Sequence, residues 1–579
     1  MIVVHVTHEA VDKVGGIGAV IAGLVTSEAY QESVTRTILL GPLLDTGKPV
    51  NLRLGVSGKV HYSSLDNIQT RPWHDKFLPI ERTYDVGIIY GTRTVHDPCT
   101  DKAVEVEVLL VDVFHANKVR LNLFKGELYR KFAVPSSQFE HIWEYEEYVR
   151  LAEPGDEALK AIGCNGDEPI LLLSHEYMGM PTALKMVLDG AKNTRTVFYA
   201  HEVAPVRPIV EKGPGHDTMF YNVMQRMAAE GRSLEQVFPE VLDNYKHALV
   251  KAARYCDHVF AVGDYIREEL RFLDGHFRTM DLDLVYNGIP AQPLSLAEKR
   301  LSRQRMKQYT RNLFGFEPTW IFAHVCRPVP SKALWRDIAV LRELEPLLAA
   351  RGETAVYYLL ATMAGQRRPQ DVRQMERVYG WPAAHENGYP DLCQGEEGLG
   401  AMMADFNEDH HATRAVFVNQ WDWCHEFCGE RMPKDMTFGD IRRGTDVEFG
   451  LSCYEPFGIS QLEPLCFGAI CILSNVCGCT GFARAASAGQ PTDNIIEANF
   501  LHVPAEATAQ EMLDLGVQAR DRIEQDEARR LAEALIERLP RSDQDLQRLM
   551  RSGYDLSQRM SWDHVVKEYF LPALNKAAR

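Results

Sequence analysis

Two glutamates eight positions apart, Glu455 and Glu463, enclose a glycine turn in the C-terminal half of the chain. Glu455 follows a short apolar run, so we expect it where a strand passes into a loop, and we expect Glu463 on the helix that follows. The backbone N–H groups of Gly458, Ile459 and Ser460 would open that helix and could receive a diphosphate, because a helix N-terminus attracts anions. Two carboxylates in such a place would make a poor hydrophobic core, so the pattern predicts a binding site.

A second glycine turn lies near the N-terminus, where Gly15 and Gly16 follow the first apolar run. Paired glycines let backbone N–H groups approach a ligand closely, and a helix is expected to begin at 17–19. Lys13 adds a positive charge just before the glycines, so the segment has the outline of a phosphate site. A dinucleotide-binding fingerprint fits less well, since its third glycine position holds Ile21.

Single histidines and a pair of aspartates are further candidates for functional residues. His201 ends an apolar run, and the carboxyl ends of strands are where α/β sheets build their sites, so a functional role is favoured. His5 and His8 lie by the first strand, where a structural role is favoured. Asp281 and Asp283 imitate a D-x-D metal signature but lead into a short strand, and we interpret them as structural.

Short apolar runs alternate with longer helical patterns along the chain, which is typical of parallel sheets covered by helices on both faces. One set of candidate strands ends before residue 263 and another begins after about residue 318. Two such sets predict two doubly wound α/β domains. The candidate strands are 2–6, 37–40, 86–90, 106–111, 170–173, 196–200 and 258–262, then 320–325, 356–360, 415–418, 447–451 and 470–473.

The junction between the two sets is expected at 290–318, which contains prolines and a basic segment. We interpret that segment as a solvated helix beside the domain boundary. The stretch 364–408 has little periodicity and many glycine, proline and charged residues. It is expected to be an irregular insertion with some helix.

Composition limits the classes of function. The 579 residues include 63 Lys and Arg against 80 Asp and Glu, and the formal net charge of −17 argues against general nucleic-acid binding. No apolar run is long enough for a membrane-spanning helix, and the N-terminus reads as a strand rather than a signal peptide. The 12 cysteines are too sparse for a disulfide scaffold and indicate reduced thiols in the cytoplasm.

Several segments resemble, in the right order, the signatures of glycogen and starch synthases. The segment KVGGI at 13–17 resembles their K-x-G-G-L/I loop, and Glu455 with Glu463 is similar to the E-x7-E signature of retaining GT-B enzymes. The other similar segments are SHEYMGM at 174–180, VFYAHE at 197–202, FAVGDY at 260–265, VYNGI at 285–289 and RPVPSK at 327–332. The resemblance covers about residues 1–290 and 318–575.

The resemblance implies a GT-B fold, in which two Rossmann-like doubly wound α/β domains face a deep cleft. Residues 1–295 would form the acceptor-side domain and 296–555 the nucleotide-sugar-binding domain. Residues 556–579 would form a helix that packs back on the first domain.

The reaction implied is transfer of a hexose, by resemblance glucose, from a nucleotide diphosphate sugar such as ADP- or UDP-glucose. The acceptor would be a hydroxyl at an α-1,4-glucan end, with the α configuration retained and no metal or other cofactor. The implied catalytic residues are His201, Arg327, Lys332 and Glu455, and the implied donor-binding residues are Lys13, Gly15, Gly16, Gly458, Ile459, Ser460 and Glu463.

Two positions depart from the bacterial and plant synthases. Ala19 stands where they carry aspartate, and Glu463 stands where they usually carry an aromatic residue. The glutamate and the KVGGI loop look more like the fungal and animal glycogen synthases or the wider E-x7-E group. Two alternatives therefore stay open: a transferase acting on a small acceptor, and a catalytically weak protein that binds glucan or nucleotide sugar.

Overall fold

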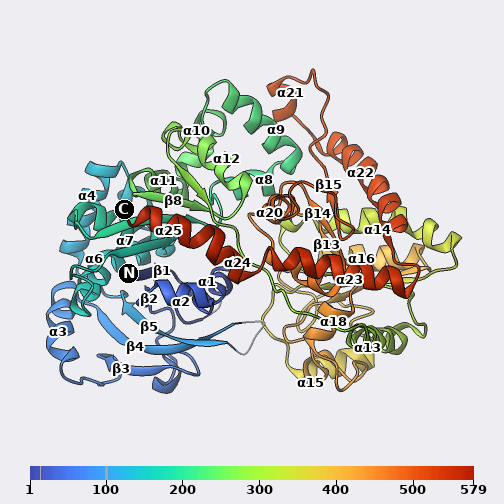
Figure 1. Ribbon diagram of the computed structural model, residues 1–579, viewed down its shortest axis with the longest axis horizontal. Coiled ribbons are helices and arrows are strands. Elements are labelled where there is room, and N and C mark those ends of the chain that lie inside the picture. The colour runs from blue at the N-terminus through green and yellow to red at the C-terminus, as the bar shows by residue number, and fades with distance from the viewer. Residues whose placement is uncertain (13–14, 98–101) are drawn as a thin grey trace. The chain divides into compact units, whose positions relative to one another are not determined.

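The computed structural model describes residues 1–12, 15–97 and 102–579, so Lys13 lies outside the described residues. The chain forms two compact units (Figure 1). Unit 1 comprises Met1–Pro208, Met224–Gly288 and Trp562–Arg579, and unit 2 comprises Ile209–Val223 and Ile289–Ser561. The units are thus not simple consecutive halves, because a short segment near residue 215 belongs to unit 2 and the last residues belong to unit 1.

Unit 1 is built on a nine-stranded sheet of order β3-β4-β5-β2-β1-β6-β7-β8-β9. The strand β1 lies between β2 and β6, is parallel to both, and is buried along its whole length, as its run of apolar residues predicts. The strands are β1 (Ile2–Val6), β2 (Arg36–Pro42), β3 (Lys59–Ser63), β4 (Gly87–His96), β5 (Ala103–Asp112), β6 (Ile170–His175), β7 (Thr194–Ala200), β8 (His258–Ala261) and β9 (Leu282–Leu284).

One edge of this sheet corrects the expectation of parallel strands. β4 pairs antiparallel with both β3 and β5, while β5 joins β2 in parallel. The first half of β5 alternates between exposed and buried residues, which is the pattern of an antiparallel strand with one face toward water. The short strand β3 carries too few apolar residues to be recognised from the sequence.

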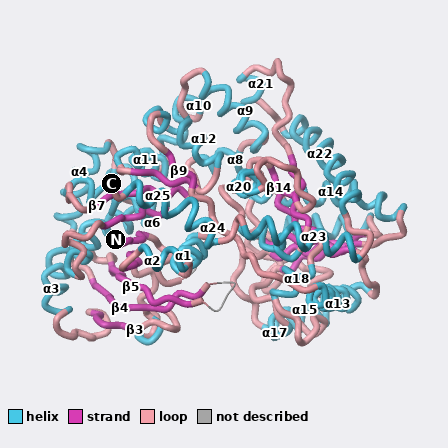
Figure 2. Tube along the Cα trace, viewed as in Figure 1, coloured by secondary structure: helices cyan, strands magenta, loops and turns pink. Residues whose placement is uncertain are grey.

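Helices cover both faces of this sheet, and Figure 2 shows them around the strands. The helices whose residues lie wholly or partly in unit 1 are α1 (Ile17–Val25), α2 (Glu28–Ser33), α3 (Trp73–Tyr84), α4 (Lys118–Phe132), α5 (Ser136–Phe139), α6 (Trp143–Ala161), α7 (Glu176–Asp189), α8 (Val206–Lys212), α9 (His216–Ala229), α10 (Leu234–Val237), α11 (Tyr245–Ala252), α12 (Asp264–Leu273), α24 (Trp562–Val565) and α25 (Leu571–Ala577).

The C-terminal segment packs within unit 1, where α24 contacts α1 (Figure 1). The Trp562 ring lies so close to Gly23 and Gly288 that a Cβ at either glycine would come within 2.1 Å and 2.5 Å of it, respectively. Lys576 forms ion pairs with Asp281 and Asp283. A lysine of α25 therefore offsets part of the charge of the two aspartates, which agrees with their structural interpretation.

Unit 2 contains a six-stranded sheet of order β12-β11-β10-β13-β14-β15, in which every pairing is parallel. Alternate side chains of β10 enter two cores, since Phe322 packs with α14 and α22 while Ile321 packs with α13. The strands are β10 (Trp320–Val325), β11 (Ala355–Leu360), β12 (Thr413–Val418), β13 (Val447–Gly450), β14 (Ile470–Ser474) and β15 (Ile495–Ala498).

The basic segment expected at the junction forms α13, whose capping box at Ser295 and Glu298 fixes its start. The predicted insertion contains two helices, α15 and α16. The remaining helices are α13 (Leu296–Phe314), α14 (Leu334–Ala350), α15 (Pro369–Val378), α16 (Glu397–Asp409), α17 (His425–Cys428), α18 (Phe438–Gly444), α19 (Ile459–Leu462), α20 (Gly478–Ala486), α21 (Ala509–Leu513), α22 (Val517–Arg538) and α23 (Asp543–Gln558).

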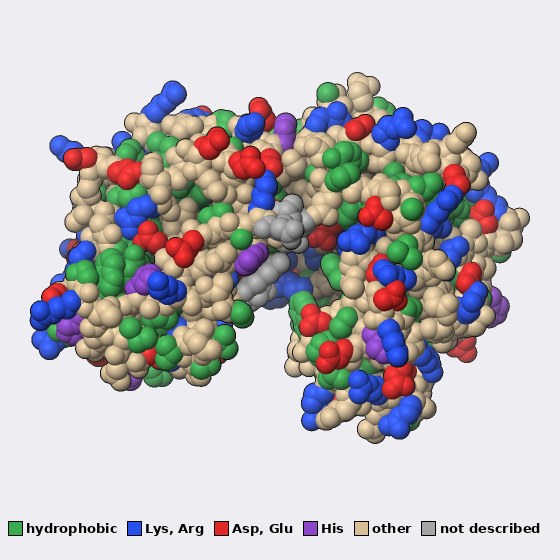
Figure 3. Space-filling model, turned by 60° about the horizontal axis from the view of Figure 1, so that its bottom comes forward, with side chains coloured by type: hydrophobic (Ala, Val, Ile, Leu, Met, Phe, Trp, Pro, Cys, Tyr) green, Lys and Arg blue, Asp and Glu red, His purple; other side chains and the backbone are tan. Residues whose placement is uncertain are grey.

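Acidic and basic side chains are interspersed on the face drawn in Figure 3. Many of them are paired: α22 and α23, for example, carry ion pairs at a spacing of three residues. Within the described residues, no helix combines the length and the apolar character that crossing a membrane requires.

Candidate functional site

In unit 2 the loop after β13 is tied to the loop after β10. The backbone N–H groups of Cys453 and Tyr454 donate to the carbonyl of Ser331, over 2.9 Å and 3.2 Å. These bonds bring Lys332 and Glu455 together as an ion pair, in which only 15% and 14% of the side chains are exposed. The sequence predicts both residues as part of one site, and the structure places them in contact.

The charge of this pair is well compensated. Burial by itself would lower the pKa of Lys332, but the neighbouring Glu455 carboxylate outweighs it and raises that pKa above its ordinary value. Lys332 is therefore a cation at neutral pH. Arg327, five positions earlier, is exposed, and its guanidinium has no ion pair among the described residues. This end of the sheet thus offers one paired and one unpaired cation.

Gly458 requires a glycine for two reasons. Its φ of +96° lies in the left-handed region, and a Cβ would come within 2.8 Å of Gln461 Oε1 and 3.0 Å of the Glu455 side chain. The turn therefore holds the backbone of Ile459 and Ser460 next to Glu455. All three predicted amide positions lie in this turn.

The position of Glu463 differs from the expectation. α19 ends at Leu462, and Glu463 begins a separate 3-10 turn, Glu463–Phe467. The reason is Pro464, which has no N–H to continue the helix. The Glu463 carboxylate lies 3.2 Å from Nε of Arg442.

Arg442 is a residue that sequence reasoning missed. Its guanidinium also contacts the buried Glu448 at 3.1 Å and the carbonyl of Ser460 at 2.5 Å. Burial raises the pKa of Glu448 to about 7 despite this contact. Arg442 therefore links Glu463 to the glycine turn, and no spacing in the sequence signals it.

In unit 1 the N-terminal glycine turn contains an unpredicted carboxylate. Glu9 is buried, and it accepts a hydrogen bond of 2.8 Å from the N–H of Gly18 in the first turn of α1. A Cβ on Gly15 would lie 3.0 Å from Glu9 Oε1, whereas Gly16, the residue before α1, has open space around it. The protein's own carboxylate thus takes an amide at the helix start, where the sequence predicts an anion site.

His201 follows β7 and lies next to two other histidines on neighbouring strands. Its Nε2 is 2.8 Å from Nδ1 of His175, at the end of β6, and Nε2 of His175 is 2.8 Å from Nδ1 of His5 in β1. Burial lowers the pKa of His5 and of His201 to about 3 and that of His175 well below its ordinary value. All three rings are therefore neutral at physiological pH.

Glu176, next to His175, is a second unpredicted group. It has a φ of +59° and is buried, and one carboxyl oxygen accepts a hydrogen bond of 2.5 Å from the N–H of Glu202. Burial and then the charge of Glu202 raise its pKa well above the ordinary value. The carboxyl of Glu176 thus lies beside the segment that carries His201.

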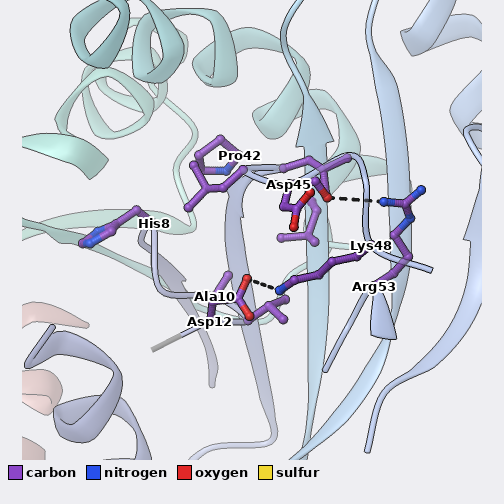
Figure 4. Close-up of a pocket in the computed structure, with 11 residues that line it drawn as sticks. His8, Ala10, Asp12, Pro42, Asp45, Lys48 and Arg53 are labelled. Atoms are coloured by element: carbon purple, nitrogen blue, oxygen red, sulfur yellow. Dashed lines mark hydrogen bonds and ion pairs between the residues drawn. The ribbon is translucent and has the colours of Figure 1, made fainter. Parts of the chain in front are cut away.

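A small hollow of about 20 Å³, with room for one or two water molecules, opens in unit 1 at the carboxyl ends of β1 and β2 (Figure 4). Lys48 pairs with Asp12 across it, and the Arg53 guanidinium donates to the carbonyl of Asp45 at 3.3 Å. Pro42, Leu43 and Leu44 add apolar surface, and His8 also borders the hollow. Paired charges beside apolar surface suit a neutral polar molecule.

One group of residues in the described part of the chain has carboxylates close enough to share a metal ion: Asp156, Glu157 and Asp189. Lys160 lies 2.8 Å, 2.9 Å and 2.9 Å from these three carboxylates, and Lys185 contacts two of them. Two lysines therefore offset most of the charge of the three carboxylates. None of the residues predicted as catalytic or donor-binding belongs to this group.

No protein-family model and no curated protein sequence matches the chain. Solved structures do match it over their whole length. The catalytic domain of starch synthase IV from Arabidopsis thaliana, bound to ADP and acarbose, has a TM-score of 0.54 and 13% identity, and the alignment covers 100% of both chains.

Two further structures give similar values. A trehalose-6-phosphate synthase from E. coli, bound with UDP-2-fluoro glucose, has a TM-score of 0.51 and 12% identity, with 100% of this chain and 99% of that one covered. A UDP-forming α,α-trehalose-phosphate synthase from Burkholderia xenovorans has a TM-score of 0.50 and 13% identity, with the same coverage. These structural neighbours are retaining glycosyltransferases of the GT-B class. At such identities the likeness shows the fold, and the chain has the GT-B fold that the sequence predicts.

Proposed function

We propose that the protein is a retaining glycosyltransferase that moves a hexose from a nucleotide diphosphate sugar to an acceptor hydroxyl. The observation that carries this proposal is the contact between Lys332 and Glu455 beside the left-handed turn at Gly458. A cation, a carboxylate and the backbone amides of a glycine turn at one end of the sheet match the needs of a sugar diphosphate. The GT-B fold supports the same conclusion by analogy.

The proposed chemistry is stabilisation of a leaving diphosphate. Negative charge grows on the phosphate oxygen as its bond to the anomeric carbon breaks, and Lys332, Arg327 and the amides of 458–460 would stabilise it. On donor binding, Lys332 exchanges part of its contact with Glu455 for phosphate, which frees the Glu455 carboxylate to accept from a sugar hydroxyl. The leaving phosphate takes the proton of the acceptor hydroxyl, so no separate general base is needed.

The other predicted residues take binding roles. Glu463 would hold the ribose of the nucleotide, and Arg442 fixes the orientation of its carboxylate. His201, kept neutral, would bind a sugar hydroxyl near the reacting carbon. In the glycine turn of unit 1, Gly16 rather than Gly18 would offer its amide to a phosphate, because Glu9 already holds the amide of Gly18.

For the acceptor we propose an α-1,4-glucan end, with glucose as the transferred sugar. The second candidate acceptor is a small sugar or sugar phosphate, and Asp12, Lys48 and Arg53 beside the hollow are the charged groups of unit 1 that would bind it. Lys48 would bind a phosphate only if it left Asp12.

A thermal-shift screen with ADP-, UDP- and GDP-glucose tests donor binding first. A donor at 100 times its dissociation constant should stabilise the protein by about 2.7 kcal/mol. The stabilising donor is then incubated with glycogen or with glucose and its phosphates, and transfer is followed. Stabilisation without turnover on any acceptor would support the alternative of a binding protein, and no stabilisation by any donor would contradict the proposal.

A further inference from the structure

Three histidines and a tyrosine form one hydrogen-bonded set inside unit 1, here called the histidine array: His201, His175, His5 and Tyr30. The two histidine–histidine distances are each 2.8 Å, and Nε2 of His5 lies 3.2 Å from the hydroxyl of Tyr30. That hydroxyl lies 3.0 Å from Oγ1 of Thr37. Both ring nitrogens of His5 and His175 are therefore used inside the protein.

The part of the array formed by His5, His175 and Tyr30 is enclosed, so its hydrogen bonds cannot be replaced by bonds to water. His5 and His175 are fully buried, and Tyr30 is 2% exposed. The rings of His175 and His201 are stacked at 5.0 Å with an angle of 11°, and Phe570 covers Tyr30 at 5.9 Å. The ring orientations are thus fixed by packing on both sides.

A neutral imidazole has one nitrogen that donates and one that accepts. Because the three rings are neutral, a donor on one side of His175 requires an acceptor on its other side. The same holds for His5. The tautomers of the three histidines are therefore coupled. All hydrogen bonds of the array donate either from Tyr30 toward His201 or from His201 toward Tyr30.

Tyr30 decides between these directions. A phenol is an acid with an ordinary pKa near 10, and a neutral imidazole nitrogen is a base, so the bond is strongest when Tyr30 donates to Nε2 of His5. Thr37 can turn its hydroxyl to donate to the phenol oxygen. It follows that Nδ1–H of His5 donates to His175, and that Nδ1–H of His175 donates to Nε2 of His201.

We propose that Tyr30, His5 and His175 are positioning residues that place the single proton of His201 on Nδ1, so that His201 donates a hydrogen bond to an oxygen of the bound sugar. The identity of this ligand rests on the proposed function, but the position of the proton does not. Among the described residues, Nδ1 of His201 makes no hydrogen bond within the protein, so it is available to a ligand.

Neighbouring polar groups do not change the direction of the hydrogen bonds in the histidine array. Tyr199 stacks on His201 at 4.5 Å, but its hydroxyl is buried without a hydrogen-bond partner among the described residues. His8 Nδ1 is likewise buried without a partner, and Nε2 of His8 lies 3.6 Å from Glu9. Neither group shares a hydrogen bond with the array.

The test is ¹H–¹⁵N NMR of the ligand-free, full-length protein labelled with ¹⁵N-histidine. The loss of one ring signal set in His201→Gln assigns His201. In the wild type we expect the proton of His201 on Nδ1. Tyr30→Phe keeps the ring against Phe570 but removes the donor, so the proton should shift from Nδ1 toward Nε2.

Two matched variants control for packing. Tyr199→Phe also removes a buried hydroxyl, on a ring stacked directly on His201, and Thr37→Val removes the hydroxyl beyond Tyr30. Both should leave the proton on Nδ1. If Tyr30→Phe does not fold, His5→Asn interrupts the array one residue later and should give the same shift.

A wild-type His201 protonated on Nε2 would overturn the inference, and so would equal spectra for Tyr30→Phe and Tyr199→Phe. Sugar transfer by the wild type is assayed separately. The expected tautomer without transfer on any donor would contradict the proposed function alone. Transfer with the opposite tautomer would contradict this inference alone.

Discussion

The two units place similar residues in opposite electrostatic settings. In unit 1, the first turn of α1 is held by the carboxylate of Glu9, and the nearby histidines are neutral. In unit 2, Lys332 is charged and paired with Glu455. Both regions carry a glycine turn after a parallel strand, but in the second the carboxylate beside the turn is itself paired with a lysine. From this difference we predict that an anion binds more readily beside Lys332 in unit 2 than beside Glu9 in unit 1.

The largest expected effect concerns histidines. Burial lowers the pKa values of His5, His175 and His201 below 6.5, so protonation favours the unfolded state, and this part of unit 1 loses stability as the pH falls below 6.5. In unit 2, burial would lower the pKa of His324, but Cys326 and Asp337 raise it well above 6.5. The stability that His324 contributes is present in full below pH 6.5 and is lost as the pH rises through its folded pKa.

Hydrogen exchange in the native state at pH 7.5 and 5.5 separates the two regions. Three histidines at one pKa unit each amount to about 4 kcal/mol of opening free energy, which β6 and β7 should lose at the lower pH. β10, which carries His324, should show no such loss. Equal losses of opening free energy in the two sheets would contradict the predicted difference between the histidines of unit 1 and His324 of unit 2.

The second effect is on catalysis. Lys332→Met should reduce turnover by roughly 10²–10³-fold, the scale for loss of one preorganised donor to a developing charge. Donor affinity should fall less, because part of the interaction arises only in the transition state. Glu455→Gln should resemble it if the carboxylate holds the reacting sugar. If Lys332→Met keeps near wild-type turnover, the assignment of Lys332 to the leaving diphosphate is wrong.

A smaller effect is expected at the other glutamate of the pair. Glu463→Gln should raise KM by about tenfold with little change in kcat, because a ribose contact contributes equally to ground and transition states. Arg442→Lys keeps the charge but not the planar contact with Glu463, so it should shift KM in the same direction. Steady-state kinetics with a saturating acceptor give both constants. Abolished turnover in Glu463→Gln would mean that its role is chemical.

Glu9→Gln sharpens the contrast at the glycine turn of unit 1. Losing the charge at the start of α1 should cost about 1 kcal/mol of stability. If the donor phosphate approaches this turn, its affinity should rise roughly fivefold, because about 1 kcal/mol of repulsion is removed. Calorimetric titration of the donor measures this. Unchanged donor affinity would mean that the donor phosphate does not bind close to this turn.

The smallest effect is expected from metal removal. The leaving charge is assigned to side-chain cations and amides, so EDTA should leave turnover unchanged. Loss of activity in EDTA with recovery in Mn²⁺ would contradict this assignment.

The alternation of strands and helices could be predicted from the sequence, because buried parallel strands are continuous apolar runs. Every candidate strand lies at a strand of the structure, and Glu455 with Lys332 was expected at one site. The antiparallel pairing of β4 could not be read in this way, since it depends on partners rather than on local pattern. Glu9, Arg442 and His175 act through contacts made across the fold, and no spacing in the sequence encodes such contacts. Pro464 did carry a readable signal, because it ends α19 before Glu463.

The central claim is tested most directly by following the anomeric proton of the donor during a reaction. ¹H NMR of the protein with the stabilising nucleotide glucose and an acceptor, either glycogen or a glucose phosphate, reports both consumption of donor and configuration of product. The account predicts donor consumption with formation of an α-linked product, and strong slowing in Lys332→Met. A β-linked product, or no consumption of any donor that binds, would contradict it.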